Sequence, residues 1–367
     1  MSVKKVAVMT GGGDCPGLNA VIRAVVHVGI ERYGWQILGV EDAFSGLVDL
    51  DYRSPHGNQW LTLASTRGIL ARGGTMLGTS NRSDPFEFVI QDPSGKKRTI
   101  DVSARVMENY AKLGLDALVS IGGDGSMKIA QRFGALGMKI VGVPKTIDND
   151  LAATDQTFGF DTAVGVATEA LDRLRDTADS HDRVMLMEVM GRHAGWIALE
   201  CGLAGGADVI LIPEIPYRVE SVAQLIRDRR RAGKNYSLIV VAEGAKPAGG
   251  EASIGERALG AMPRLMGAAQ RVAEALGEQV DADMRVTVLG HIQRGGSPSS
   301  FDRVLATRYG VAAAELVANE QFGQMVALRN GQIVSVDIAE AVAAPKLVDP
   351  EAQIVKQARA LGVCFGD

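Results

Sequence analysis

The chain has 367 residues, of which 46% are hydrophobic and 22% charged, and this balance excludes a disordered or fibrous protein. A net charge of −4 without a basic tail argues against a nucleic-acid partner, and no stretch is apolar over the roughly 18 residues that a membrane span needs. The three cysteines are far apart and form no CxxC pair, so they predict neither a zinc site nor a disulfide framework and fit a cytoplasmic protein. The length predicts two domains.

The first part of the chain alternates apolar runs with glycine-rich turns. Val3–Thr10 is predicted to form a strand that passes through Gly11–Gly17 into a helix at Leu18–Tyr33. Glycines let the backbone approach a phosphate, and the helix that follows offers free N–H groups, although a tight turn requires glycine too. Other elements are expected at Gln36–Val40 (strand), Glu87–Lys97 (hairpin), Val102–Leu113 (helix), Leu115–Ile121 (strand), Met127–Leu136 (helix) and Ile140–Val143 (strand).

A second glycine turn, Gly122-Gly123-Asp124-Gly125-Ser126, follows the strand that ends at Ile121. Mg²⁺ binds one or two protein carboxylates together with substrate phosphates, so Asp124 is the predicted metal ligand and Mg²⁺ the predicted cofactor. An aspartate that only caps the next helix would give the same pattern. The loop Arg72–Arg82 carries arginines at both ends, and these suit either phosphate or the solvent.

The segment VGVPKTIDND, at 141–150, is the most informative part of the sequence. A buried strand breaks there at Pro144, and polar groups follow at once. Ligands of parallel sheets bind beyond the carboxyl ends of the strands, so Lys145 and Asp148 are expected to face a ligand. Asp148 is the first candidate for a catalytic residue, against the alternative that it only hydrogen-bonds its own turn.

The second part of the chain repeats the alternation of strands and helices. Strands are predicted at Arg183–Val189, Ala207–Ile212, Tyr236–Ala242 and Arg285–Leu289, and helices at Asp161–Asp179, Val219–Ala232, Ser253–Leu276 and Phe301–Asn319. Met325–Arg329 and Gln332–Val336 read as a hairpin around Asn330-Gly331, followed by a short helical tail without apparent chemistry. These groups together suit phosphoryl transfer, which needs positioning, charge neutralisation and a base for the attacking hydroxyl.

Five motifs in one order resemble the phosphofructokinase family: GGGDCPGLNAVIRA, IGGDGS, PKTIDND, MGRHAGW and LGHIQRGGSPSSFDR. They run from Gly11 to Arg303. The GGDGS turn also occurs in NAD kinases and lipid kinases, but the other four motifs make the resemblance specific.

The resemblance implies transfer of a phosphoryl group to the 1-hydroxyl of fructose 6-phosphate, with Asp148 as the proton acceptor. It implies that Arg192 and Lys145 assist the transfer. The donor and Mg²⁺ positions are Gly13, Arg82, Gly123, Asp124, Gly125 and Ser126. The sugar-phosphate positions are Thr146, Ile147, Asp148, Met190, Gly191, Arg192, Glu243, His291, Ile292, Gln293 and Arg294, with Arg183 and Arg285 reaching across from a neighbouring subunit.

Two positions bear on the phosphoryl donor. Users of pyrophosphate in the family carry an aspartate where this chain has Gly125, and Gly125 leaves room for the α-phosphate of ATP. Lys145 is usual for users of pyrophosphate, but together with a glycine it goes with ATP. The sequence therefore predicts an ATP-dependent 6-phosphofructokinase of the mixed branch, with a reversible pyrophosphate-dependent enzyme as the alternative. A non-catalytic, sugar-phosphate-binding regulatory subunit is a further alternative, against which the intact Asp124 and Asp148 argue.

The expected fold is α/β, with two three-layer αβα Rossmann-like domains and the active site in the cleft between them. The expected donor and Mg²⁺ domain is 1–159 plus 293–343, and the expected sugar-phosphate domain is 160–292 plus 344–367. A homodimer or homotetramer with shared active sites is expected. Two departures from the family stand out. The loop GTSNRSDPF, which contains Arg82, is at least one residue longer than is usual, so the resemblance supports Arg82 as a nucleotide contact less than it supports Asp124. Extra sequence lies around Gly260–Ala275, and no effector site is assigned.

Overall fold

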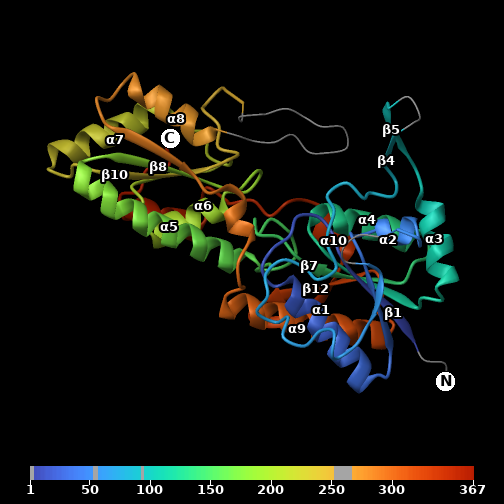
Figure 1. Cartoon of the computed structure of the whole chain (residues 1–367). Helices are drawn as coiled ribbons and strands as arrows, with labels where there is room; N and C mark the ends of the chain where they lie inside the picture. Colours follow the sequence, from blue (N-terminus) through green and yellow to red (C-terminus); the bar gives the residue numbers. More distant parts are fainter. Residues whose placement is uncertain (1–3, 53–56, 92–94, 252–266) are drawn as a thin grey trace.

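The structure is a computed structural model that describes residues 4–52, 57–91, 95–251 and 267–367. Two sheets lie in separate halves of the molecule, each between layers of helices (Figure 1). The first sheet has the strand order β13-β12-β7-β6-β1-β2-β3 and the second the order β11-β8-β10-β9. The predicted α/β fold with two Rossmann-like units is confirmed.

The strands and helices of the first half have the following bounds. The strands are β1 (Lys5–Thr10), β2 (Gln36–Val40), β3 (Gln59–Leu61), β6 (Ala117–Gly122), β7 (Ile140–Pro144), β12 (Gln324–Arg329) and β13 (Gln332–Asp337), with a separate hairpin of β4 (Phe88–Gln91) and β5 (Lys97–Ile100). The helices are α1 (Leu18–His27) with the π-helical turn η1 (Val28–Arg32), α2 (Ser45–Val48), α3 (Ser103–Lys112), α4 (Asp124–Ala135), α9 (Ser300–Ala318) and α10 (Ile338–Val342).

The second half is smaller. Its strands are β8 (Val184–Val189), β9 (Val209–Leu211), β10 (Ser237–Ala242) and β11 (Met284–Val288). Its helices are α5 (Phe160–His181), α6 (Trp196–Ala204), α7 (Val219–Arg231), α8 (Ala268–Gly277) and α11 (Gln353–Ala360), and the 3₁₀ turn η2 (Gly290–Arg294) leads back toward the first half.

Alternating side chains of the strands fill both faces of each sheet. In β1, Val6 and Val8 pack with α1 and α9, whereas Ala7 and Met9 pack on the opposite face with α3 and α4. This alternation is the two-residue period of a strand buried on both sides, and it explains why β1 reads as a continuous apolar run.

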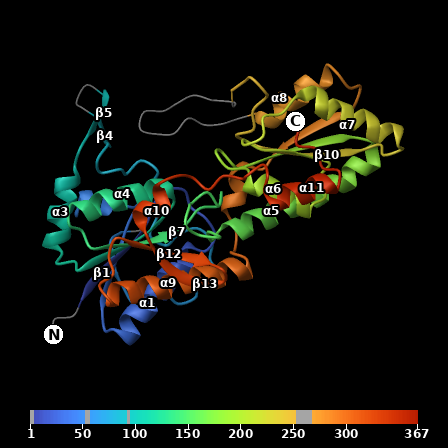
Figure 2. The ribbon, with the colours of Figure 1, turned by 180° about the vertical axis from the view of Figure 1, so that it is seen from behind.

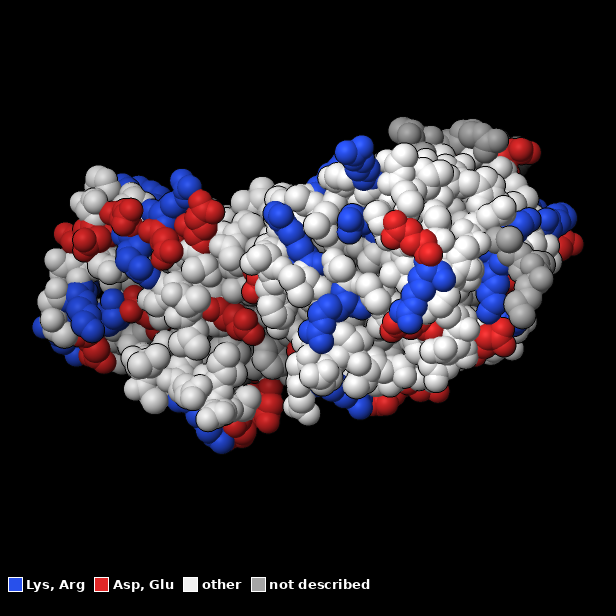
Figure 3. All heavy atoms as spheres, turned by 90° about the horizontal axis from the view of Figure 1, so that it is seen from below, with Lys and Arg blue, Asp and Glu red and all other residues white. Residues whose placement is uncertain are grey.

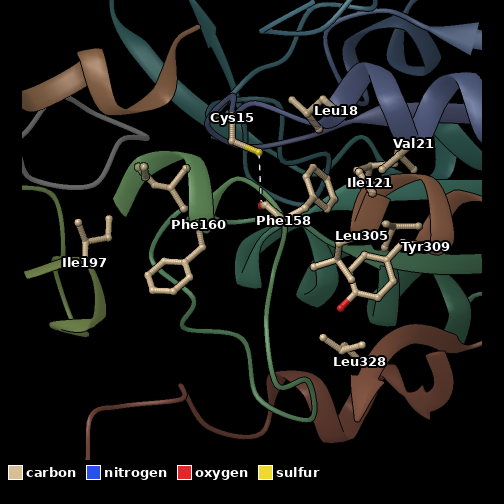
Figure 4. Packing of buried hydrophobic residues seen from close by; sticks show 14 of the residues in the cluster. Cys15, Leu18, Val21, Ile121, Phe158, Phe160, Ile197, Leu305, Tyr309 and Leu328 are labelled. Atoms are coloured by element: carbon tan, nitrogen blue, oxygen red, sulfur yellow. Dashed lines mark hydrogen bonds between the residues drawn. The ribbon is translucent and has the colours of Figure 1, made fainter. Parts of the chain in front are cut away.

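The two halves share one core cluster where the chain crosses between them. Phe158 and Phe160 are both fully buried at this crossing, and they pack in the same cluster as Leu18 of α1 and Ile197 of α6. Figure 4 shows this junction, with the Sγ of Cys15 directed at the main-chain oxygen of Phe158, 3.7 Å away. The halves are therefore joined by packing as well as by chain connections.

Some of the predicted elements differ from those in the structure. α4 begins at Asp124 rather than at Met127, so Asp124, Gly125 and Ser126 form its first turn instead of a loop. No predicted element corresponds to α2, α6 or β3. Most of the predicted Ser253–Leu276 helix lies outside the described residues, and α8 begins at Ala268. The hairpin around Asn330-Gly331 is confirmed, since both residues have positive φ, as a two-residue hairpin turn needs.

Candidate active site

The first group of site residues lies at the carboxyl ends of three neighbouring parallel strands. β1, β6 and β7 are adjacent in the sheet, and each ends in one of the polar or glycine-rich segments. Because the three strands are parallel neighbours, Gly13, Asp124 and Asp148, which follow them, lie at one edge of the sheet. Ligands of open parallel sheets bind at such an edge.

Glycines at this edge let the loops touch. A Cβ on Gly11 would lie 2.7 Å from the Oγ of Ser126, and a Cβ on Gly122 would lie 2.3 Å from it. The main-chain N–H of Gly12 donates to the oxygen of Ser80 over 3.2 Å, which ties the loop before Arg82 to the first glycine loop. The Arg82 side chain itself is exposed at the rim.

Gly125 differs from these glycines because it is not required by packing. It lies in the first turn of α4, its φ is not positive, and a Cβ placed on it would meet no described atom within 4 Å. The position therefore opens onto free space beside the N-terminus of α4, where main-chain N–H groups and the helix dipole favour an anion.

Lys145 is buried behind the glycine loop. Its Nζ donates to the main-chain oxygen of Gly13, and a Cβ on Gly12 would lie 3.4 Å from that Nζ. Burial lowers the pKa of Lys145. The loop and the ammonium thus form one unit at the end of β1.

Asp148 is the most perturbed acid of the site. Removal from water raises its pKa to about 7, the charges of Asp150 and Glu243 add to the rise, and Arg294 and Lys145 oppose it. Its Oδ1 is buried and has no hydrogen-bond partner among the described residues. Buried acceptors are rarely left unpaired, so this oxygen is available to a hydroxyl group of a ligand.

Asp150 is a member of the site that the sequence analysis left without a role. Burial raises its pKa, and the nearby charge of Asp124 adds to the rise, while Thr146 and His193 oppose it. The sequence signal that could have identified Asp150 is the second carboxylate of the TIDND segment. Asp124 itself is half-exposed and forms an ion pair of 2.7 Å with Lys128.

The second half contributes the loops that follow β8, β10 and β11. Burial raises the pKa of Glu243, and the charges of Arg192 and Arg294 oppose the rise, so the carboxylate lies near both guanidinium groups. The main-chain N–H of Met190 donates to the Oε1 of Gln293 over 2.9 Å, while the Nε2 of the same buried Gln293 has no partner among the described residues.

Arg294 links the two halves at the site. Its Nη1 donates to the oxygen of Asp14 over 3.2 Å, and a Cβ on Gly13 would lie 2.7 Å from the same nitrogen. Arg294 therefore covers the first glycine loop while it faces Asp148 and Glu243. His291 and Ile292, on the same 3₁₀ turn, are exposed.

Two predicted residues are not brought to the site within one chain. Arg183 and Arg285 lie at the amino ends of β8 and β11, opposite to the ends that carry Met190 and His291. There both pair with Asp283, over 2.7 Å from the Nε of Arg183. The two arginines form a separate basic pair at the other end of the second sheet.

The comparisons with known proteins agree with this arrangement. The model of the family described as phosphofructokinase matches residues 5–317. An ATP-dependent 6-phosphofructokinase 2 from Clostridium perfringens is 49% identical over 369 residues, which cover 100% of this chain and 99% of the relative. A pyrophosphate–fructose 6-phosphate 1-phosphotransferase from Streptomyces coelicolor is 51% identical over 350 residues, which cover 94% of this chain and 96% of the relative.

Among solved structures, Pichia pastoris phosphofructokinase in the T-state matches with a TM-score of 0.79 at 32% identity. The match covers 94% of this chain but only 36% of the yeast chain, so this chain spans about a third of that protein. Since the family model spans most of the sequence and relatives at about half identity align over nearly all of it, the chain belongs to the phosphofructokinase family.

Proposed function

We propose that this protein is an ATP-dependent 6-phosphofructokinase, which transfers the γ-phosphoryl group of ATP to the 1-hydroxyl of fructose 6-phosphate. The observation that carries the proposal is the unpaired, buried Oδ1 of Asp148, at the same sheet edge as the N-terminus of α4 and the first glycine loop. A free acceptor beside an anion-binding edge is what the transfer of a phosphoryl group to a hydroxyl requires.

In this mechanism Asp148 accepts the proton of the 1-hydroxyl as the oxygen attacks phosphorus. A pKa of about 7 suits a base that works near neutral pH. Lys145, behind the first glycine loop, and Arg192, in the loop after β8 of the other half, neutralise charge on the transferring group. Glu243, His291 and Arg294 hold the sugar phosphate, and Thr146, Ile147, Met190 and Gly191 shape its pocket.

The donor set fits Mg²⁺. Within the described part of the chain, no three His, Cys, Asp or Glu side chains converge to form a complete protein site. Asp124, with Asp150 close enough to feel its charge, offers the one or two carboxylates that Mg²⁺ takes when phosphates and waters supply its other ligands. When bound, the ion screens the negative charge of the donor phosphates.

The choice of ATP rests on Gly125. Relatives at about half identity are named for either donor, so overall identity does not assign it. The open space at Gly125 leaves room for a nucleotide, and neither packing nor backbone conformation requires glycine there. Lys145 is the observation that favours the alternative, a reversible pyrophosphate-dependent enzyme.

The test is the initial rate with fructose 6-phosphate and Mg²⁺, with ATP and pyrophosphate supplied separately. We expect activity with ATP. The variant Gly125→Asp should lose about 100-fold or more in kcat/KM for ATP, because a carboxylate against a phosphate costs several kcal/mol. Gly125→Ala is the matched control, since it adds only a methyl group in open space and should keep ATP use. Unchanged ATP kinetics in Gly125→Asp would refute this assignment of Gly125, and wild-type activity with pyrophosphate alone would reverse the assignment of the donor.

We further propose a homodimer or homotetramer with shared active sites. Val288 and Ile292 are 57% and 61% exposed, although they are apolar and lie at the end of β11, the edge strand of its sheet, and just after it. A cluster of exposed apolar residues at a sheet edge is typical of a contact surface. Such a contact would bring Arg183 and Arg285 of one subunit to the sugar phosphate held by another.

The division of labour between the halves is part of the same proposal. We assign donor and Mg²⁺ binding to 1–159 with 293–343, and sugar-phosphate binding to 160–292 with 344–367.

A cytoplasmic location is supported by the three unpaired cysteines, all of which lie in the described residues. Among the helices of the described residues, none is long and apolar enough to span a membrane. The face in Figure 3 shows a waist between two lobes, with basic and acidic side chains mixed on both.

A further inference from the structure

The segment at 343–349 is a third crossing between the two halves of the molecule. It runs from α10 in the first half to α11 in the second, and Figure 2 shows it passing between them as a single extended strand of chain. Lys346 lies in the middle of this segment and is partly buried, unlike its exposed neighbours Pro345 and Leu347. The sequence analysis found no chemistry in this tail.

Lys346 holds the loop that carries Asp148. Its main-chain N–H donates to the oxygen of Asp150 over 2.8 Å, and its Nζ donates to the main-chain oxygens of Thr154 and Asp155. The preceding Pro345 pairs with Leu151 in an isolated bridge. Lys346 thus contacts the loop between β7 and α5 at two separate points, Asp150 and Thr154–Asp155.

This loop needs external support because its backbone is unfavourable. Asn149 and Ala153 both have positive φ, at 52° and 63°, and neither is glycine. Left-handed backbone at such residues persists only where the surrounding structure holds it in place. The bonds from Lys346 lie on both sides of Ala153 and next to Asn149, where the loop would otherwise relax.

The same segment is bonded to the loop that carries Arg192. The main-chain oxygen of Lys346 accepts from the Nε1 of Trp196 over 2.9 Å, and its Nζ lies 5.3 Å from the centre of the Trp196 ring. Two residues further, the N–H of Val348 donates to Glu214, which also accepts from the N–H of Gly195. Gly195 and Trp196 end the loop that begins at Met190.

We propose that Lys346 is a positioning residue that sets the placement of Asp148 relative to Arg192. The base and the arginine come from different halves, and Lys346 is bonded to the loops of both. This inference rests on the proposed phosphoryl transfer, in which those two side chains act on the same group. Displacement of a reacting group by about 1 Å can cost about 100-fold in rate, so the loss of the two Nζ bonds and of the Nζ contact with the Trp196 ring should affect turnover, although the main-chain bonds remain.

The test compares Lys346→Met with Lys346→Arg and with a matched control on the same tail, Lys356→Met. Lys356 is exposed and pairs only with Glu351 among the described residues, at 3.1 Å. We expect Lys346→Met to lower kcat by about 10- to 100-fold while KM for both substrates stays within about threefold. Lys346→Arg should recover most of kcat because it can still donate to the carbonyl oxygens. Lys356→Met should match the wild type.

Two further measurements keep the outcome decisive. Hydrogen exchange at 148–158 should be faster in Lys346→Met than in the wild type and unchanged in Lys356→Met, and this readout does not depend on the reaction being the proposed one. If Lys346→Met does not fold, Trp196→Phe removes a single bond to Lys346 and should lower kcat in the same way. A variant with a lower melting temperature but normal kcat and normal exchange would overturn the inference. An inactive wild type with the expected exchange difference would instead reject the proposed function alone.

Discussion

At the scale of single residues, Asp148 is the group whose environment most directly predicts behaviour in solution. Desolvation raises its pKa to about 7, and only the ionised carboxylate can accept a proton. We therefore expect kcat/KM for fructose 6-phosphate to fall as the pH drops below about 7.

Asp148→Asn keeps the shape of the side chain, removes its charge and should lower turnover by about 10²- to 10⁴-fold. The measurement is the pH–rate profile of both proteins. Near-normal turnover in the variant, with the same acidic limb, would exclude Asp148 as the base.

Asp302 gives a prediction about stability rather than catalysis. It is fully buried, it accepts from the N–H and the hydroxyl of Thr162, and its Oδ1 has no partner among the described residues. Burial raises its pKa to about 6 from an ordinary 3.8, so the folded protein favours the protonated form. The stability that this group contributes is complete below pH 4 and is lost as the pH rises through about 6.

We expect Asp302→Asn to remove this pH dependence, because an amide can keep the bonds to Thr162 without a charge. Relative to the variant, the wild type should lose about 2 kcal/mol of unfolding free energy between pH 4 and pH 7, because the carboxyl has a pKa of about 6 in the folded protein and 3.8 ordinarily. Urea unfolding of both proteins across this range is the measurement. Parallel curves for the two proteins would contradict the assignment.

The site residues differ in how far the sequence could reveal them. Asp124, Lys145 and Asp148 follow strands directly, so the strand-end rule was enough to place them at one edge. Lys346 could not be found this way, because its role comes from bonds that its Nζ donates to main-chain oxygens almost 200 residues earlier in the chain. Its side chain carries no motif, and only the folded chain shows what it touches.

At the scale of secondary structure, the packing of α1 against α9 depends on one small residue. A Cβ on Gly310 of α9 would lie 2.7 Å from both the Cβ of Ala24 and the main-chain oxygen of Val21 in α1. Gly165 of α5 provides the comparison, because it is a helix glycine with free space around it. A Cβ there would meet no described atom within 4 Å, and its φ is not positive. The same substitution should therefore have opposite effects in the two helices.

Gly310→Ala should lower the unfolding free energy, because overpacking costs about 1–3 kcal/mol and outweighs the gain in helix propensity of about 1 kcal/mol. Gly165→Ala should raise it by about 0.5–1 kcal/mol through propensity alone. Chemical denaturation with both variants provides the comparison. Equal shifts of the same sign would show that the α1–α9 contact does not limit residue size.

The boundaries of the elements were predictable where composition changes sharply and uncertain where glycine begins a helix. β2 is found at the predicted Gln36–Val40 because Gly34 and the charged Glu41 bound an apolar run. α4 was predicted three residues late because Gly125 was read as part of a loop. Glycine has a low helix propensity, but the first turn of a helix tolerates it when the turn faces a ligand.

At the scale of the whole molecule, the arrangement depends on chain crossings that a local pattern does not specify. The chain passes between the halves near Phe158, again after η2, and a third time at 343–349. The family resemblance led us to expect crossings near 160 and near 292 and a tail, 344–367, that belongs to the second domain, but the sequence did not indicate that this tail is bonded to the loops of the site. Contacts of this kind join segments far apart in the sequence, so no local pattern of residues indicates them.

The proposal of shared sites can be tested by mixing two inactive variants. If Arg285 acts on the sugar phosphate of a neighbouring subunit, each active site combines Asp148 of one subunit with Arg285 of the other. Asp148→Asn then impairs the site of its own subunit, and Arg285→Ala impairs the site of the neighbour. In a mixed dimer, one site then carries both defects and the other is intact, so co-refolded variants should regain about a quarter of the wild-type rate.

The matched control pairs Asp148→Asn with Arg294→Ala. Arg294 contacts Gly13 and Asp14 of its own chain, so each site of a mixed dimer carries one of the two defects and neither site is complete. Recovery in both mixtures, or in neither, would reject a site shared through Arg285, and the unequal result would place the partner's arginine at the sugar phosphate.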